Sequence, residues 1–96
     1  MLTLEDLRQR RQSILSCAEK HGAFQIRVFG SLSRGEGKPG SHVDFLVQFE
    51  PDRSPLDHFG LIQELASLLQ VPIDVVDETG VSPHMREQIF GEAVLL

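Results

Sequence analysis

The 96-residue chain has a single cysteine and contains neither tryptophan nor tyrosine. Because Cys17 has no second cysteine to pair with, small secreted proteins that depend on internal disulfide bonds are excluded. No apolar run approaches the roughly 20 residues that span a bilayer, and the charged N-terminal segment MLTLEDLRQRRQ is unlike a signal peptide. We therefore expect a cytoplasmic protein that does not associate with a membrane.

The chain also lacks an excess of positive charge, since 9 basic residues face 14 acidic residues and the formal net charge is −5. A nucleic-acid binder generally needs a basic stripe that displaces counterions, so direct binding to nucleic acid is not expected. Hydrophobic residues make up 41% of the chain and charged residues 24%, which is typical of a folded protein rather than a disordered one. At this length we expect one domain over residues 1–96.

The spacing of apolar residues predicts alternating helices and strands. Thr3 is a suitable N-cap for a first helix, and Ser54 followed by Pro55 begins a second. The helices are expected over residues 3–20, from Pro55 onward and over residues 83–90, and the strands over residues 24–29, 42–49, 71–77 and 93–96. A right-handed crossover between the strands 42–49 and 71–77 makes these two strands parallel. The predicted fold class is α/β, with a small mixed sheet packed against helices.

Alternation within the strands predicts which side chains share a face. One face is expected to carry Phe24, Ile26 and Val28 of the first strand. In the strand 42–49, Val43 and its alternate neighbours form one face, while His42 and Asp44 share the other.

Two aspartates interrupt strands that are otherwise apolar: Asp44 in VDFLV and Asp74 in VPIDVV. Burying an unpaired carboxylate is unfavourable by several kcal/mol. Either aspartate taken alone could simply face solvent. If the two parallel strands are adjacent, however, His42, Asp44 and Asp74 converge, and neither strand contains a lysine or arginine to neutralise them. A divalent cation is then the natural counter-charge.

A glycine-rich segment, GSLSRGEGKPG, follows the first strand. Gly30 allows a sharp bend, and the backbone N–H groups that follow it and the hydroxyl of Ser31 could hold phosphate oxygens, with Arg34 adding positive charge. Taken alone, Gly-Ser is a weak signal and is better explained by an ordinary structural turn. The segment matches neither the Walker pattern nor the GxGxxG fingerprint of dinucleotide-binding proteins.

Taken together, the segment FGSLSRGEGKPGSHVDFLV and the later strand PIDVVD resemble the signature of the DNA polymerase β-type nucleotidyltransferase superfamily, and in particular its minimal nucleotidyltransferases. The resemblance implies a polymerase β-like fold in which Gly30 and Ser31 hold the β- and γ-phosphates of a nucleoside triphosphate, with Arg34 nearby. Asp44 would ligate Mg²⁺. Asp74 would serve a second metal ion and help to deprotonate the acceptor.

The resemblance also implies a biological role. Minimal nucleotidyltransferases are commonly antitoxins of HEPN/MNT toxin–antitoxin pairs, which transfer AMP from ATP to the HEPN ribonuclease toxin. The alternative is a degenerate module that neutralises its partner by binding alone. Two positions depart from the family pattern: Leu32 stands where relatives often carry arginine, and His42 replaces the first aspartate. His42 could ligate a metal with altered preference (Mn²⁺ rather than Mg²⁺), leave the site inactive, or play no part in metal binding.

The remaining candidate ligands have simpler interpretations. Cys17 is expected to be a small core residue. The histidines outside the motif are expected to lie on the surface or at helix ends: His21, His58 and His84.

Overall fold

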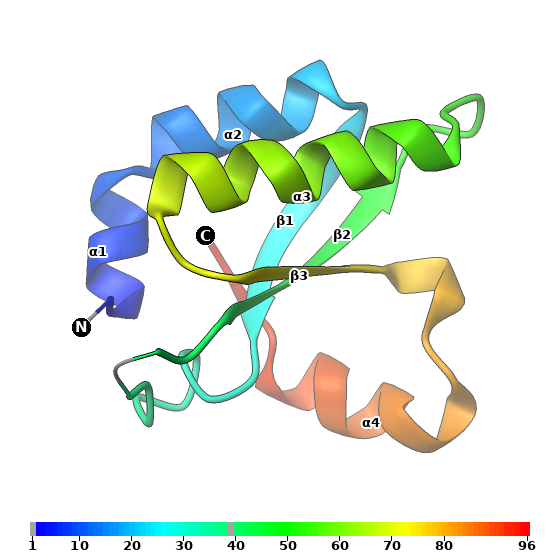
Figure 1. Ribbon diagram of the computed structural model, residues 1–96. Coiled ribbons are helices and arrows are strands. Elements are labelled where there is room, and N and C mark those ends of the chain that lie inside the picture. Colours follow the sequence, from blue (N-terminus) through cyan, green and yellow to red (C-terminus); the bar gives the residue numbers. More distant parts are fainter. Residues whose placement is uncertain (1, 39) are drawn as a thin grey trace.

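The computed structural model describes residues 2–38 and 40–96 and contains a four-stranded sheet in the order β3-β2-β1-β4 (Figure 1). The strands are β1 (Ala23–Phe29), β2 (Val43–Phe49), β3 (Ile73–Asp77) and β4 (Val94–Leu95). The helices are α1 (Leu4–Gln9), α2 (Arg11–Lys20), α3 (Pro55–Leu69) and α4 (Pro83–Glu92), with a short 3₁₀ turn, η1 (Glu78–Gly80). β2 runs parallel to β3 and antiparallel to β1, so the predicted mixed α/β sheet is confirmed.

Helices cover both faces of this sheet. In Figure 1, α2 and α3 lie on one side and α4 lies on the other. Phe45 of β2 is fully buried in the main core cluster together with Leu61 and Leu65 of α3. Leu46 points to the opposite face and is also fully buried, and Ile89 of α4 is buried, with 7% exposure. None of the helices in the described ranges is long and apolar enough to cross a bilayer.

The predicted single helix over residues 3–20 is wrong, because the chain forms two helices that meet at Arg10. Thr3 caps α1 through a capping box with Asp6, as the sequence predicted. The segment between Leu7 and Ile14 is entirely polar, so no residue at the junction of the two helices contributes an apolar side chain to the core. Leu7 of α1 and Ile14 of α2 are both fully buried.

The predicted face of β1 is also partly wrong. The pairing of β1 with β2 is irregular between Phe24 and Arg27, where β1 holds one more residue than β2, and Gln25 has a φ of 53°. Such a bulge reverses the alternation of side chains. Phe24 is therefore 45% exposed, whereas Ile26 and Val28 are buried as predicted.

The crossover from β2 through α3 to β3 positions the candidate site. Ser54 caps α3 with a capping box, and Pro55 occupies the first turn. The chain then returns beside β2 with Asp44 directly opposite Asp74. The predicted adjacency of the two parallel strands is confirmed.

Candidate functional site

Strand register brings together the three side chains that the sequence singled out. His42 Nε2 lies 3.2 Å from Asp44 Oδ1 and 3.1 Å from Asp74 Oδ2. The ligand atoms of all three residues lie within 4.8 Å of one another. The side chains of His42 and Asp74 are 54% and 62% exposed, whereas that of Asp44 is only 17% exposed. The cluster therefore has one deep carboxylate and two accessible groups.

The pleat of β2 explains why Asp44 is not buried in the core. Val43 and Phe45, its neighbours in sequence, are 1% and 0% exposed and belong to the main core cluster. Successive side chains of a strand point to opposite faces, so Asp44 faces away from that cluster and toward His42.

Burial raises the pKa of Asp44 above its ordinary value of 3.8. The nearby His42 opposes this shift, while the charge of Asp74 and a hydrogen bond with it add to the shift. Two carboxylates that face each other at such short range disfavour double ionisation. A cation bound between them would relieve both the desolvation and the repulsion.

Asp44→Asn should raise the free energy of unfolding of the metal-free protein by about 1 kcal/mol at pH 7, because it removes a poorly compensated charge. Because the pKa of Asp44 is raised in the native state, the native wild type keeps the Asp44 carboxyl proton at pH values above 3.8, where the unfolded chain has released it. The free energy of unfolding of the wild type therefore falls as the pH rises through the raised pKa of Asp44. In Asp44→Asn, which has no carboxyl group at this position, that decrease is absent. Urea unfolding at a series of pH values in chelator measures the difference. An advantage of the variant that does not grow with pH would contradict this account.

Gly30 begins a bend that lies against the Asp44 carboxylate. Its φ is 78°, a left-handed conformation that favours glycine. A Cβ atom at this position would lie 2.3 Å from Asp44 Oδ2. The absence of a side chain therefore permits the close approach of the bend to the carboxylate.

Gly30 and Arg34, two of the expected nucleotide-binding residues, both donate hydrogen bonds to Glu92, a residue that the sequence did not single out. The Gly30 N–H donates to Glu92 Oε2 at 3.2 Å, and Arg34 donates to Glu92 Oε1 at 2.6 Å. Arg34 also donates to Glu36 at 3.0 Å. Burial raises the pKa of Glu92, but hydrogen bonds from Gln88, Arg34 and Gly30 outweigh it and leave the pKa lowered. An anionic group thus already occupies these donors.

Ser31 and Leu32 continue the bend. The Ser31 carbonyl accepts the backbone N–H groups of Arg34 and Glu36 at 3.2 and 2.9 Å, which closes the turn. Leu32 is 5% exposed and belongs to the main core cluster. The positive charge at the bend therefore comes from Arg34.

The donor set fits a divalent cation. Two carboxylates supply oxygen ligands of the kind that Mg²⁺ and Mn²⁺ prefer, and His42 supplies an imidazole nitrogen that suits Mn²⁺ better than Mg²⁺. Asp44 and Asp74 also carry the charge that such an ion would neutralise.

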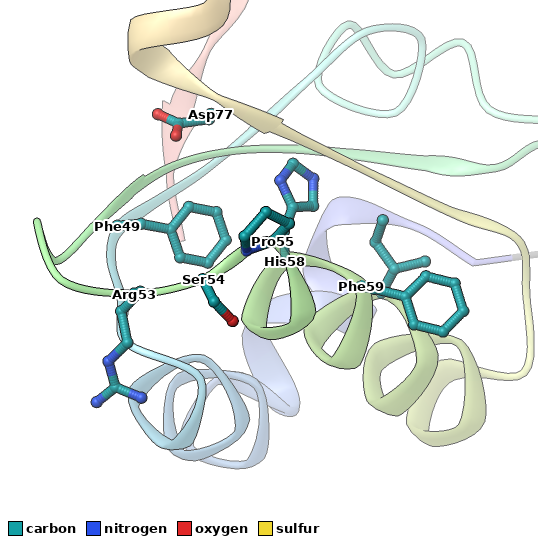
Figure 2. Close-up of a pocket in the computed structure, with 8 residues that line it drawn as sticks. Phe49, Arg53, Ser54, Pro55, His58, Phe59 and Asp77 are labelled. Carbon is teal, nitrogen blue, oxygen red and sulfur yellow. The ribbon is translucent and has the colours of Figure 1, made fainter.

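A cavity of about 470 Å³ lies at the far end of the same strands (Figure 2). Phe49 and Asp77, the last residues of β2 and β3, line it together with His58 and Phe59 of α3. Asp44 and Phe49 are five residues apart, roughly 16 Å along a strand, so the cavity does not belong to the carboxylate cluster. His58 stacks on Phe49 and donates to the Val75 carbonyl at 2.6 Å, which is a structural role.

Comparisons with known proteins agree with this geometry. The family model described as nucleotidyltransferase domain matches residues 10–96. The protein adenylyltransferase MntA of Thermococcus cleftensis is 36% identical over 99 residues, a match that covers 98% of this chain and 96% of that protein. A solved structure named as a candidate minimal nucleotidyltransferase is 47% identical with a TM-score of 0.87, covering 99% of this chain and 97% of the other.

A more distant solved structure shares the fold. It contains tri-AMPylated HEPN toxin of Shewanella oneidensis in complex with its MNT antitoxin. The match has a TM-score of 0.69 at 21% identity and covers 92% of this chain and 69% of the other.

Proposed function

Since this chain belongs to the nucleotidyltransferase domain family, we propose that it transfers AMP from ATP to a side chain of a partner protein. The observation that carries the proposal is the convergence of Asp44 and Asp74 beside the bend at Gly30. Its relative in Thermococcus cleftensis, 96% of which the match covers, is named a protein adenylyltransferase, which supports AMP as the transferred group.

In the proposed reaction, an acceptor hydroxyl oxygen attacks the α-phosphorus of ATP. The bond from that phosphorus to the bridging oxygen breaks, and pyrophosphate leaves. Asp74, the more exposed carboxylate, would accept the hydroxyl proton. Gly30 and Ser31 present backbone N–H groups to the β- and γ-phosphates, and Arg34 adds positive charge once Glu92 gives up these donors.

Asp44 and Asp74 would hold the divalent cations, with His42 as a further ligand. When bound, such ions neutralise the phosphates and stabilise the attacking and leaving oxygens. We propose Mg²⁺ as the physiological ion in a two-metal site. The His42 nitrogen predicts that Mn²⁺ supports at least as much activity.

We propose a HEPN ribonuclease toxin as the partner, and the role of this chain as its antitoxin. The acceptor must be held in line with the α-phosphate. Residues 1–96 are largely used by the sheet and the helices that cover it, so the partner itself would supply the acceptor. The complex of AMPylated HEPN toxin with its MNT antitoxin, which has the same fold, supports this choice.

A second candidate function is neutralisation by binding alone. The position of His42 favours it, because the ring nitrogen lies 3.1–3.2 Å from both carboxylates. A protonated ring at this position would take the place of a metal cation. Under this alternative the chain would bind its partner without transferring AMP.

Incubating the chain with its partner, a divalent cation and ATP labelled at either the α- or the γ-phosphate separates the two functions. The adenylyltransferase proposal predicts that the α-label, but not the γ-label, appears on the partner. Folded chain that binds the partner but transfers no label with either Mg²⁺ or Mn²⁺ would support binding alone. In that case, a large gain of transfer in His42→Asp would identify His42 as the inactivating residue.

A further inference from the structure

A second cluster of metal-ligating side chains lies between α2 and α3, outside the site described above. It consists of Cys17 on α2, His21 at the C-terminal end of that helix, and Glu64 on α3. Cys17 Sγ donates to Glu64 Oε2 at 3.4 Å, and His21 Nε2 lies 2.9 Å from Glu64 Oε1. The three ligand atoms lie within 4.8 Å of one another. Both oxygens of one carboxylate thus face a sulfur and a nitrogen ligand.

Residue spacing on α2 and a glycine on α3 allow Cys17, His21 and Glu64 to lie close together. Cys17 and His21 are four residues apart, which places them on one face of α2. Gly60 of α3 lies against the His21 ring, and a Cβ atom there would approach the ring to 2.8 Å. Glycine in the middle of a helix is unfavourable by roughly 1 kcal/mol. Here it leaves the space that lets the ring lie beside Glu64, one turn further along α3.

Solvent can reach the cluster. The side chains of His21 and Glu64 are 15% and 40% exposed, whereas Cys17 is 8% exposed. A cavity of about 330 Å³ opens beside Cys17 and Glu64 and leaves room for a water molecule as a further ligand. Lys20 Nζ lies 2.7 Å from Glu64 Oε1, but its side chain is 67% exposed and can move aside.

The hydrogen bonds within the cluster show which protons a metal ion would have to replace. Hydrogen bonds from Lys20, His21 and Cys17 lower the pKa of Glu64 to about 2, so it is a carboxylate at neutral pH. Burial raises the pKa of Cys17 to about 12, and Glu64 adds to that shift, so the thiol keeps its proton. That proton lies between Sγ and a Glu64 oxygen.

We propose that Cys17, His21 and Glu64 form a binding site for a divalent transition-metal ion of the Zn²⁺ class. One thiol, one imidazole and one carboxylate are the three ligand types that zinc takes in proteins, and a water molecule completes four-coordination. On binding, the S–H bond of Cys17 breaks, its proton passes to solvent, and the thiolate sulfur bonds to the ion. The Nε2–H of His21, which donates to Glu64, also gives up its proton as the ring changes to the Nδ1–H tautomer, and Nε2 then bonds to the ion. The ion then links the C-terminal end of α2 to the middle of α3.

Titrating the full chain with Co²⁺ tests the site directly, because only a thiolate ligand gives a sulfur-to-cobalt charge-transfer band in the near ultraviolet. We expect the band to saturate at one equivalent and to disappear when Zn²⁺ is added. Saturating Zn²⁺ should raise the Tm by about 5 °C, reversibly with chelator. Asp44→Asn should keep the band, which separates this site from the carboxylate cluster.

Cys17→Ser should abolish the band, and Glu64→Gln and His21→Asn should each weaken Co²⁺ binding at least about 10-fold. Glu19→Gln, which removes an exposed carboxylate from the same helix, is the matched control and should change nothing. Folding of each variant is checked by circular dichroism. The proposal is overturned if folded wild-type chain shows no charge-transfer band, or if Glu64→Gln and His21→Asn both bind Co²⁺ with wild-type affinity.

Discussion

Asp74→Asn is expected to reduce AMP transfer to the partner at least about 100-fold, since a ligand of the proposed metal site supplies several kcal/mol of transition-state stabilisation. The fold should not change. Asp74 is 62% exposed, and its Oδ2 atom lies 3.1 Å from Nε2 of His42, which is 54% exposed. The free energy of unfolding should therefore stay within about 0.5 kcal/mol of the wild type.

Asp52→Asn is the matched control, because it removes a carboxylate from the exposed turn before α3. Initial rates of label transfer and denaturant unfolding, measured on both variants, separate loss of chemistry from loss of fold. If Asp74→Asn transferred AMP at the same rate as Asp52→Asn, Asp74 would have no part in the reaction.

Gly30→Ala should also abolish transfer, with a loss of at least about 100-fold, because the new Cβ atom would displace the Asp44 carboxylate. That atom would lie 2.3 Å from Asp44 Oδ2. The left-handed φ of 78° adds about 1 kcal/mol of backbone strain for alanine. Together, strain and displacement should lower the free energy of unfolding by about 1–3 kcal/mol.

Gly35→Ala separates these two effects. Gly35 has a nearly identical φ of 75°, but a Cβ atom there would meet nothing within 4 Å. This variant should show the backbone strain alone and keep its transfer activity. Equal transfer rates in Gly30→Ala and Gly35→Ala would show that contact between the bend and Asp44 is not required.

The carboxylate cluster could be predicted because its geometry depends on local rules. Period-two alternation places His42 and Asp44 on one face, and the crossover through α3 makes β2 and β3 parallel neighbours. These two facts predict that Asp74 can approach His42 and Asp44, and the structure adds the register that places Asp44 directly opposite Asp74. The polar residues that interrupt these apolar strands, Asp44 and Asp74, were the signal that predicted the site.

Features that depend on distant contacts could not be predicted. Glu92 lies 62 residues from Gly30 in sequence, and only the packing of α4 against the sheet brings its carboxylate to the bend. The bulge at Gln25 inverted the predicted exposure of Phe24, because alternation alone does not show where an extra residue enters a strand.

The cluster of Cys17, His21 and Glu64 also depends on a distant contact, so the sequence alone did not predict it. Cys17 and His21 have helical spacing, but their third ligand candidate, Glu64, comes from another helix. Cys17 is buried as expected. His21, expected at a helix end, is the C-cap of α2, and its ring packs against Gly60.

The central claim is that Asp44 and Asp74 bind the cation that serves a nucleotide held at Gly30 and Ser31. A crystal structure with Mn²⁺ and an ATP analogue that has a methylene bridge between the α- and β-phosphates tests it most directly. We predict anomalous density for Mn²⁺ bonded to both aspartates, the triphosphate against Gly30 and Ser31, and Glu92 displaced from the Gly30 N–H. A bound nucleotide elsewhere on the chain, with no Mn²⁺ between Asp44 and Asp74, would contradict the account.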